Sequence, residues 1–199
     1  MSDMPAPTRE HIRLRPITVG EYHRMGDAGI LGPDERVELL NGRILEMPPI
    51  GPRHAYILTE LYALLQRTFH GRAVVRAQQP LTLGSLSEPE PDIVIARGPS
   101  ERYAAVHPTA ADALLVIEVS DSMLAIDRGE KLTAYAQGGV DEYWIVNLID
   151  RVLERFSESD GTSFQERRIA RLGEFVAPRA FPNDAIAVDD ILALPHGSQ

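Results

Sequence analysis

Residues 113–120 read Ala-Leu-Leu-Val-Ile-Glu-Val-Ser, an apolar run with one glutamate near its end. Continuous apolar runs of this length are typical of central strands that are covered on both faces. We therefore expect such a strand over 113–119. Because successive side chains of a strand alternate, Glu118 should lie on the face opposite Ile117 and Val119, with Ser120 on its own side.

The sequence on either side of this run predicts alternating helices and strands. Thr18 with Glu21, and Asp127 with Glu130, have the spacing of capping boxes, and Asn41-Gly42 is typical of a hairpin turn between two strands within 35–47. Helices are expected over 18–27, 54–69, 127–138 and 189–192. Further strands are expected over 73–77, 81–83, 92–96, 143–148, 151–156, 163–169 and 185–188.

These elements predict one α/β domain over 16–193, in which a mixed central sheet is flanked by helices. A lead-in is expected over 1–15 and a tail over 194–199. The composition of the 199 residues, 44% hydrophobic and 25% charged, suits such a domain. The chain has no cysteine, which excludes a disulfide scaffold, a cysteine-ligated metal and a thiol nucleophile. Its apolar runs are far too short for a membrane span, and we expect a cytoplasmic protein.

The charged residues narrow the possible partners. The net charge is −9, with 29 acidic and 20 basic residues, so the chain repels nucleic acid at long range. This argues against a basic nucleic-acid-binding module, but it is compatible with an enzyme that holds cations in an acidic pocket. The basic residues are 19 arginines and one lysine, Lys131. Arginine cannot imitate a compact ammonium group with a shiftable pKa, which makes Lys131 a candidate for a specific role.

Three acidic residues lie in apolar strand context, where burial of a charge is costly. They are Glu38 before the hairpin turn, Asp92 at the start of its strand, and Glu118. Carboxylates that meet in a dry cleft repel one another and usually require a divalent cation, and oxygen ligands favour Mg²⁺ or Mn²⁺. Such an ion can activate water and stabilise a phosphodiester under attack. Lys131, near the start of the next helix, could reach back to this group.

Each of these residues alone also has an ordinary structural explanation. The Pro-Asp pair at 91–92 is typical of a strand entry, and a lone strand glutamate is typical of an edge or an ion pair. Lys131 on an amphipathic helix is by default a solvated surface residue. An aspartate, a glutamate and a lysine in this order are more specific than any one of them.

Six motifs extend this pattern over roughly residues 18–190. They are ERVELLNG at 35–42, MPPIGPRH at 47–54, EPEPDI at 88–93, LVIEVSDS at 115–122, DRGEKL at 127–132 with YA at 135–136, and EYWIV at 142–146. Together they resemble the Uma-two family of restriction endonucleases, in the PD-(D/E)xK nuclease superfamily. The resemblance implies a restriction-endonuclease-like fold, a divalent-metal site and cleavage of DNA.

The resemblance also implies roles for particular residues. Asp92 matches the aspartate of the family motif, Glu118 its second acidic residue, and Glu38 an additional acidic residue from the hairpin. The motif lysine normally follows the glutamate by two positions, where this chain has Ser120. The lysine is displaced to the next helix, which indicates Lys131.

Our main hypothesis is a metal-dependent DNA endonuclease. Asp92, Glu118 and the carbonyl group of Val119 would hold Mg²⁺ or Mn²⁺, with Glu38 as an outer or second-metal ligand. Lys131 would orient or activate the attacking water. The residues that could contact the substrate are Arg36, Arg53 and Arg128, which could hold phosphates, and His54, for which a structural role that satisfies backbone groups is the better expectation. Tyr143 and Trp144 are expected in the core.

The alternative is a non-catalytic, oligomeric binding module that keeps the nuclease fold. The acidic balance and the lack of an obvious DNA-reading element favour it, whereas the intact set of Glu38, Asp92, Glu118 and Lys131 argues against it. A homodimer is expected for the endonuclease, because cutting both strands of a duplex needs two sites and symmetric dimers are the commonest assembly.

Overall fold

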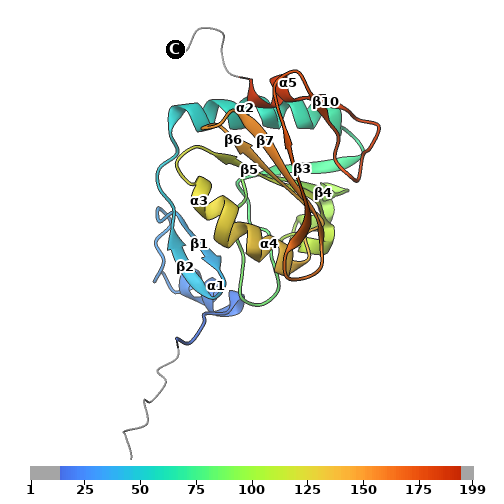
Figure 1. Ribbon diagram of the computed structural model, residues 1–199. Coiled ribbons are helices and arrows are strands. Elements are labelled where there is room, and N and C mark those ends of the chain that lie inside the picture. Colours follow the sequence, from blue (N-terminus) through green and yellow to red (C-terminus); the bar gives the residue numbers. More distant parts are fainter. Residues whose placement is uncertain (1–13, 194–199) are drawn as a thin grey trace, which may run out of the picture.

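The centre of the computed structural model, which describes residues 14–193, is a mixed sheet of six strands (Figure 1). In sheet order the strands are β3 (Ala73–Ala77), β4 (Ile93–Arg97), β5 (Ala113–Ser120), β6 (Glu142–Asn147), β7 (Val152–Ser159) and β8 (Phe164–Ala170). Neighbours pair antiparallel except β5 and β6, which are parallel. The mixed α/β sheet predicted from the sequence is confirmed. The expected tail, and all but the last two residues of the expected lead-in, lie outside the described residues.

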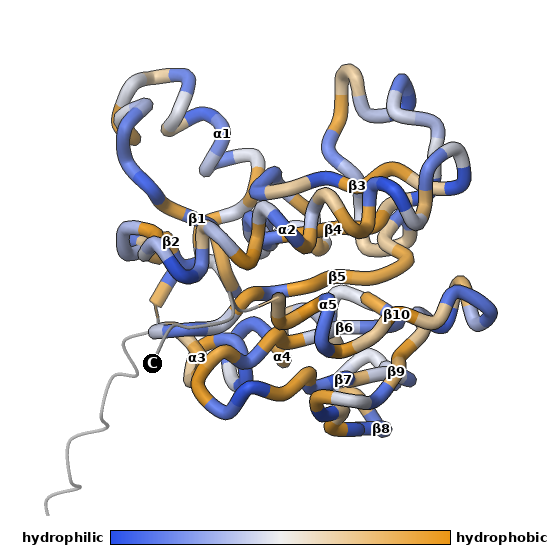
Figure 2. The backbone as a smooth tube through the Cα atoms, turned by 90° about the horizontal axis from the view of Figure 1, so that it is seen from above, coloured by the Kyte–Doolittle hydropathy of each residue, from blue (hydrophilic) through white to orange (hydrophobic). Residues whose placement is uncertain are grey.

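Helices cover both faces of this sheet around β5. On one face α2 (Pro52–Thr68) buries Ile57, Leu61 and Leu65 in a core with Ile117 and Val119, where the short helix α5 (Val188–Leu192) joins it. On the other face α4 (Leu132–Gly138) packs its apolar side chains against the opposite face of β5. In Figure 2 β5 is an apolar strand in the middle of the sheet, between β4 and β6, and its side chains belong to the buried clusters on both faces, which confirms the central strand expected over 113–119.

The N-terminal part of the chain forms a separate small unit beside the sheet (Figure 1). Helix α1 (Val19–Asp27) begins with the predicted capping box of Thr18 and Glu21. Strands β1 (Val37–Leu40) and β2 (Arg43–Glu46) form the predicted hairpin, and both turn residues, Asn41 and Gly42, have positive φ. The N–H group of Glu88 donates to the carbonyl oxygen of Leu39 at 2.8 Å, which ties the hairpin to the loop before β4.

The helical segment after β5 begins earlier than predicted. It consists of α3 (Leu124–Ile126), a π-helical turn η3 (Asp127–Lys131) and α4, and it ends at Gly139 with φ +85°. The prediction that Asp127 caps the helix is therefore wrong. Burial of Leu124 anchors the segment three residues upstream, so that Asp127 lies inside the helical segment and is itself buried.

The strand predicted over 81–83 is also wrong. Leu81 and Leu83 are buried, but their N–H groups donate to the carbonyl oxygens of Pro89 and Ser87 within one loop, so the alternating pattern reflects burial without a sheet ladder. The remaining short elements are η1 (Ser100–Tyr103), η2 (Ala110–Asp112), β9 (Phe175–Val176) and β10 (Ile186–Ala187). None of the helices in the described part of the chain is long and apolar enough to cross a membrane.

Candidate active site

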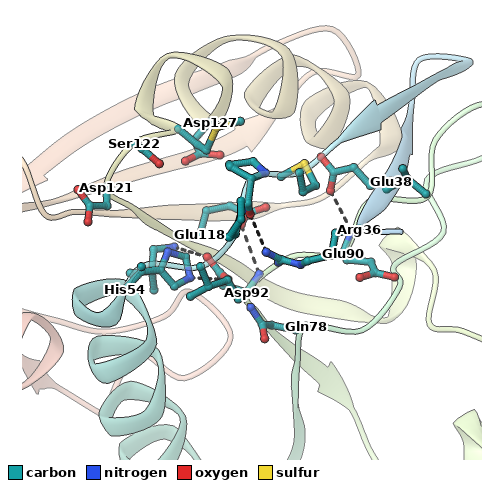
Figure 3. A pocket seen from close by; sticks show the side chains of 18 of the residues that line it. Arg36, Glu38, His54, Gln78, Glu90, Asp92, Glu118, Asp121, Ser122 and Asp127 are labelled. Carbon is teal, nitrogen blue, oxygen red and sulfur yellow. Dashed lines mark hydrogen bonds and ion pairs between the residues drawn. The ribbon is translucent and has the colours of Figure 1, made fainter. Parts of the chain in front are cut away.

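A cavity of about 560 Å³ lies where the start of β4, the end of β5 and the first turn of α2 meet (Figure 3). The β1–β2 hairpin, the segments that enter and leave it, the η3 turn and the loop after β5 also contribute to its lining. Four residues singled out in the sequence, Glu38, Asp92, Glu118 and Lys131, line this one cavity, and each is at most 7% exposed. The structure therefore brings together side chains from four separate elements.

The pairing of two strands places Asp92 beside Glu118. Ile93 of β4 pairs with Ile117 of β5, so the preceding residue on one strand lies opposite the following residue on the other. The N–H group of Asp92 donates to Oε2 of Glu118 at 3.3 Å. The N–H group of Val119 donates to Oδ2 of Asp92 at 2.8 Å. These hydrogen bonds hold the two carboxylates at neighbouring positions on the floor of the cavity.

Lys131 faces this pair from η3. Its Nζ atom lies 2.9 Å from Oε1 of Glu118 and 3.4 Å from Oε2 of Glu38. Burial alone would lower the pKa of Lys131, but the charges of Glu118, Glu38 and the nearby Asp127 outweigh burial and raise the pKa well above its ordinary value. Lys131 is therefore a buried, protonated ammonium group, not the solvated surface residue of the ordinary interpretation.

Two further residues of the same helical segment contact the site, and sequence reasoning gave neither of them a role there. The hydroxyl group of Tyr135 donates to Oε1 of Glu118 at 2.7 Å, and Tyr135 is fully buried. Asp127 lines the cavity, and burial raises its pKa to about 6, although Lys131 lowers it. Asp127, Lys131 and Tyr135 are spaced four residues apart, which places them on one helix face. This spacing was the available signal.

Burial also raises the pKa of Glu118, against the opposing charge of Lys131. Asp92, Asp127 and Glu38 contribute to the same shift, because like charges disfavour ionisation. One ammonium group thus faces several carboxylates. Any further positive charge, whether a proton or a cation, would therefore stabilise the site.

Glu38 extends from β1 into the cavity. Its Oε2 atom accepts a hydrogen bond from the N–H group of Glu90 at 3.2 Å. Its Oε1 atom is buried and has no hydrogen-bond partner among the described residues. A buried oxygen without a partner is costly, so this atom is available to a ligand.

His54 lies in the first turn of α2 and contacts a carboxylate of the site. Its Nε2–H group donates to Oδ1 of Asp92 at 2.9 Å, and the side-chain amide of Gln78 donates to the same oxygen at 3.3 Å. Burial alone would lower the pKa of His54, but the hydrogen bond and charge of Asp92 outweigh it and raise the pKa. The expectation that His54 satisfies backbone groups is wrong: its hydrogen bond fixes Asp92.

The three candidate arginines lie in different places. Arg36 lines the cavity, and its Nη1 atom donates to the carbonyl oxygen of Pro48 at 2.6 Å. Arg53 donates to the carbonyl oxygen of Leu148, and Arg128 forms ion pairs with Glu154 and Asp150. Neither Arg53 nor Arg128 lines the cavity. Tyr143 and Trp144 are fully buried in the core, as expected.

The donor atoms of the cavity suit a hard cation. Within residues 14–193, no three acidic or histidine side chains are grouped as a ready-made metal cage. Mg²⁺, however, is usually held by only one or two carboxylates together with water and substrate phosphates. Asp92 and Glu118 form such a pair. The carbonyl group of Val119 points to the same side of β5 as its N–H group, toward Asp92, and the unpaired oxygen of Glu38 adds a further donor.

Comparisons with known proteins agree with this geometry. The model of the Uma2 family, described as "Putative restriction endonuclease", matches residues 19–189. A solved structure from Anabaena variabilis ATCC 29413, titled as that of "a putative nuclease belonging to DUF820", is similar with a TM-score of 0.71 and 16% sequence identity. The similarity covers 89% of this chain and 98% of that chain, and at this identity it supports the fold alone. No match was found among curated proteins.

Proposed function

The chain belongs to the Uma2 family, and we propose that it is a divalent-metal-dependent endonuclease that hydrolyses phosphodiester bonds of DNA. The observation that carries the proposal is the meeting of Asp92, Glu118 and Lys131 on the floor of one cavity. A structural ion pair needs one carboxylate for one ammonium group. Here Glu38 and Asp127 bring further carboxylates to the same ammonium group, an excess of negative charge that a divalent cation would offset.

Asp92, Glu118 and the carbonyl group of Val119 would hold Mg²⁺ or Mn²⁺, with Glu38 as an additional ligand. An ion bound there would lower the pKa of a bound water molecule and stabilise the negative charge of the phosphodiester. The contribution of Asp92 depends on His54 and Gln78, which fix one of its oxygens. These two residues are positioning residues in the proposed site.

Lys131 would act as a hydrogen-bond donor. Its raised pKa keeps it protonated, so it cannot serve as a general base at neutral pH. An ammonium group has three donors, of which one donates to Glu118, while Glu38 lies within ion-pair distance. A donor that is not used by Glu118 can hold the attacking water or a phosphate oxygen, and Arg36 at the lining of the cavity can contact a neighbouring phosphate.

Cleavage of both strands of a duplex would need two such sites. We therefore propose a homodimer for that reaction, since one cavity holds a single set of these residues. Sedimentation of the purified protein, compared with the ratio of nicked to linear plasmid product, tests this part of the proposal. A monomer that linearises plasmid in one encounter would contradict it.

The test of the function is Mn²⁺-dependent cleavage of supercoiled plasmid. We expect nicking by the wild type, no nicking by Asp92→Ala or Lys131→Ala, and normal nicking by the control Glu60→Gln, which removes an exposed carboxylate of α2 outside the cavity. Folding of each variant is checked by its melting temperature. Absence of cleavage by the wild type in Mn²⁺ and Mg²⁺ would overturn the proposal.

A parallel measurement addresses the non-catalytic alternative. Mn²⁺ should raise the melting temperature of the wild type and of Glu60→Gln, and raise that of Asp92→Ala much less, because binding to the folded state stabilises it. A wild type that neither binds Mn²⁺ nor cuts DNA would favour the binding module, whereas one that binds Mn²⁺ without cutting DNA would have an assembled site for another substrate or partner.

A further inference from the structure

Part of the cavity lining is apolar and comes from the segments that enter and leave the β1–β2 hairpin. Its members are Pro33, Met47, Pro48, Pro49 and Ile50. The N–H group of Met47 donates to the carbonyl oxygen of Arg36 at 2.7 Å, and the Arg36 side chain donates to the carbonyl oxygen of Pro48. We call this set of five residues the apolar wall. Because its prolines have a fixed φ, the backbone of this wall loses little conformational entropy when a ligand binds.

The rest of the lining is strongly acidic. Among the described residues, seven carboxylates line the cavity, against the cations Arg36 and Lys131 and the imidazole of His54. Duplex DNA carries one negative charge per about 1.7 Å of its axis, so a duplex that pressed into this cavity would bring many phosphates close to these carboxylates. A single phosphodiester beside Lys131 and a divalent ion meets far less repulsion.

The size and depth of the cavity also argue against entry of a duplex. A sphere of 560 Å³ is about 10 Å across. A DNA duplex is wider than this, because its major groove alone is roughly 12 Å wide. The carboxylates of Asp92 and Glu118 are almost fully buried at its floor, with residues 7% and 3% exposed. One nucleotide unit can reach them only if its neighbours do not hold it in a stack against a complementary strand.

From these observations we infer that the substrate strand is unpaired where it is cut: a single strand, or the single-stranded flap of a branched DNA. Its phosphodiester lies on the carboxylate floor while the adjoining sugar and base pack on the apolar wall. This inference rests on the proposed function and names the class of substrate for the same site.

The test compares one labelled DNA sequence as a single strand, as a flap and as a full duplex, in Mn²⁺. Because extrusion of a paired nucleotide costs a few kcal/mol, we expect kcat/KM on the unpaired forms to exceed that on the duplex by about tenfold to hundredfold. Ile50→Asn should raise KM for the single strand by about threefold to tenfold, since it removes an apolar contact of the base. The control Phe175→Asn changes a 70% exposed side chain that does not line the cavity, and it should leave KM unchanged.

Equal or faster cleavage of the duplex would overturn the inference and leave the proposed function intact. So would an unchanged KM in Ile50→Asn. If no form is cut, the proposed function fails, and the inference is decided by binding. Fluorescence anisotropy of Asp92→Asn with the same DNAs in Mn²⁺ would then support it if the single strand binds in preference, and refute it if the duplex binds better or neither binds.

Discussion

Replacement of Lys131 by methionine tests the electrostatic centre of the site. The ammonium group is buried, 2.9 Å from Glu118 and 3.4 Å from Glu38. At an effective dielectric constant of about 20, these distances correspond to gross attractions of about 6 and about 5 kcal/mol. The desolvation of the charges offsets much of this attraction, and breaking a buried pair by removing one partner is expected to cost about 3–5 kcal/mol.

The cost should depend on pH, because the carboxylates that remain can take up protons. At pH 8, without divalent metal, Lys131→Met should unfold with a free energy about 3–5 kcal/mol lower than that of the wild type. For a chain of this size, this corresponds to a melting temperature lower by roughly 6–20 °C. At pH 5 the difference should be clearly smaller. Urea unfolding followed by circular dichroism at both pH values, in a chelating buffer, measures it.

A double variant is the matched control for this experiment. Lys131→Met combined with Glu118→Gln removes both members of the ion pair, so it should be more stable at pH 8 than Lys131→Met alone. Two results would refute the reasoning: unfolding of Lys131→Met at the wild-type urea concentration at both pH values, or a double variant that is less stable than the single one.

Three further predictions concern pH, metal affinity and the hairpin. Burial raises the pKa of Asp127 to about 6. The stability that its protonation contributes is therefore complete below its ordinary pKa of 3.8 and is lost as the pH rises through 6. The melting temperature without metal should fall over this pH range, and should fall less in Asp127→Asn. Tyr135→Phe removes a 2.7 Å hydrogen bond to Glu118 and should lower the free energy of unfolding by about 1–2 kcal/mol. It should also alter the affinity for Mn²⁺ measured by calorimetry, and an unchanged affinity would show that this contact is structural only. Gly42→Ala should destabilise the chain by about 2 kcal/mol or more in urea unfolding, because φ is +72° and the new Cβ would overlap a proline side chain; Gly29→Ala, with φ +68° and open space, should cost less.

Local sequence signals located most elements of the fold, because caps and turns are made by neighbours along the chain. The capping box of Thr18 and Glu21 and the turn at 41–42 are confirmed for this reason. The two errors, at 81–83 and at the start of the helix at Asp127, have a different origin. Both depend on which apolar side chains the folded core buries, and this is decided by contacts distant in sequence.

The site was predictable to the extent that it follows from strand order. Once β4 and β5 are neighbours, the pairing of Ile93 with Ile117 brings Asp92 to Glu118. The part played by Asp127 was hidden, because its spacing to Glu130 also fits a helix cap. The catalytic roles of these residues stay predictions.

Lys131 is the only side-chain amine of the chain, and it is both buried and protonated. Acylating reagents attack a neutral, accessible amine, so the folded protein should resist modification at this position. Modification would require a transient opening of the cavity, and its rate would report how often the site is exposed to solvent. The rate of acylation of this one residue, measured by mass spectrometry, thus reports the transient opening of the site without any engineered label.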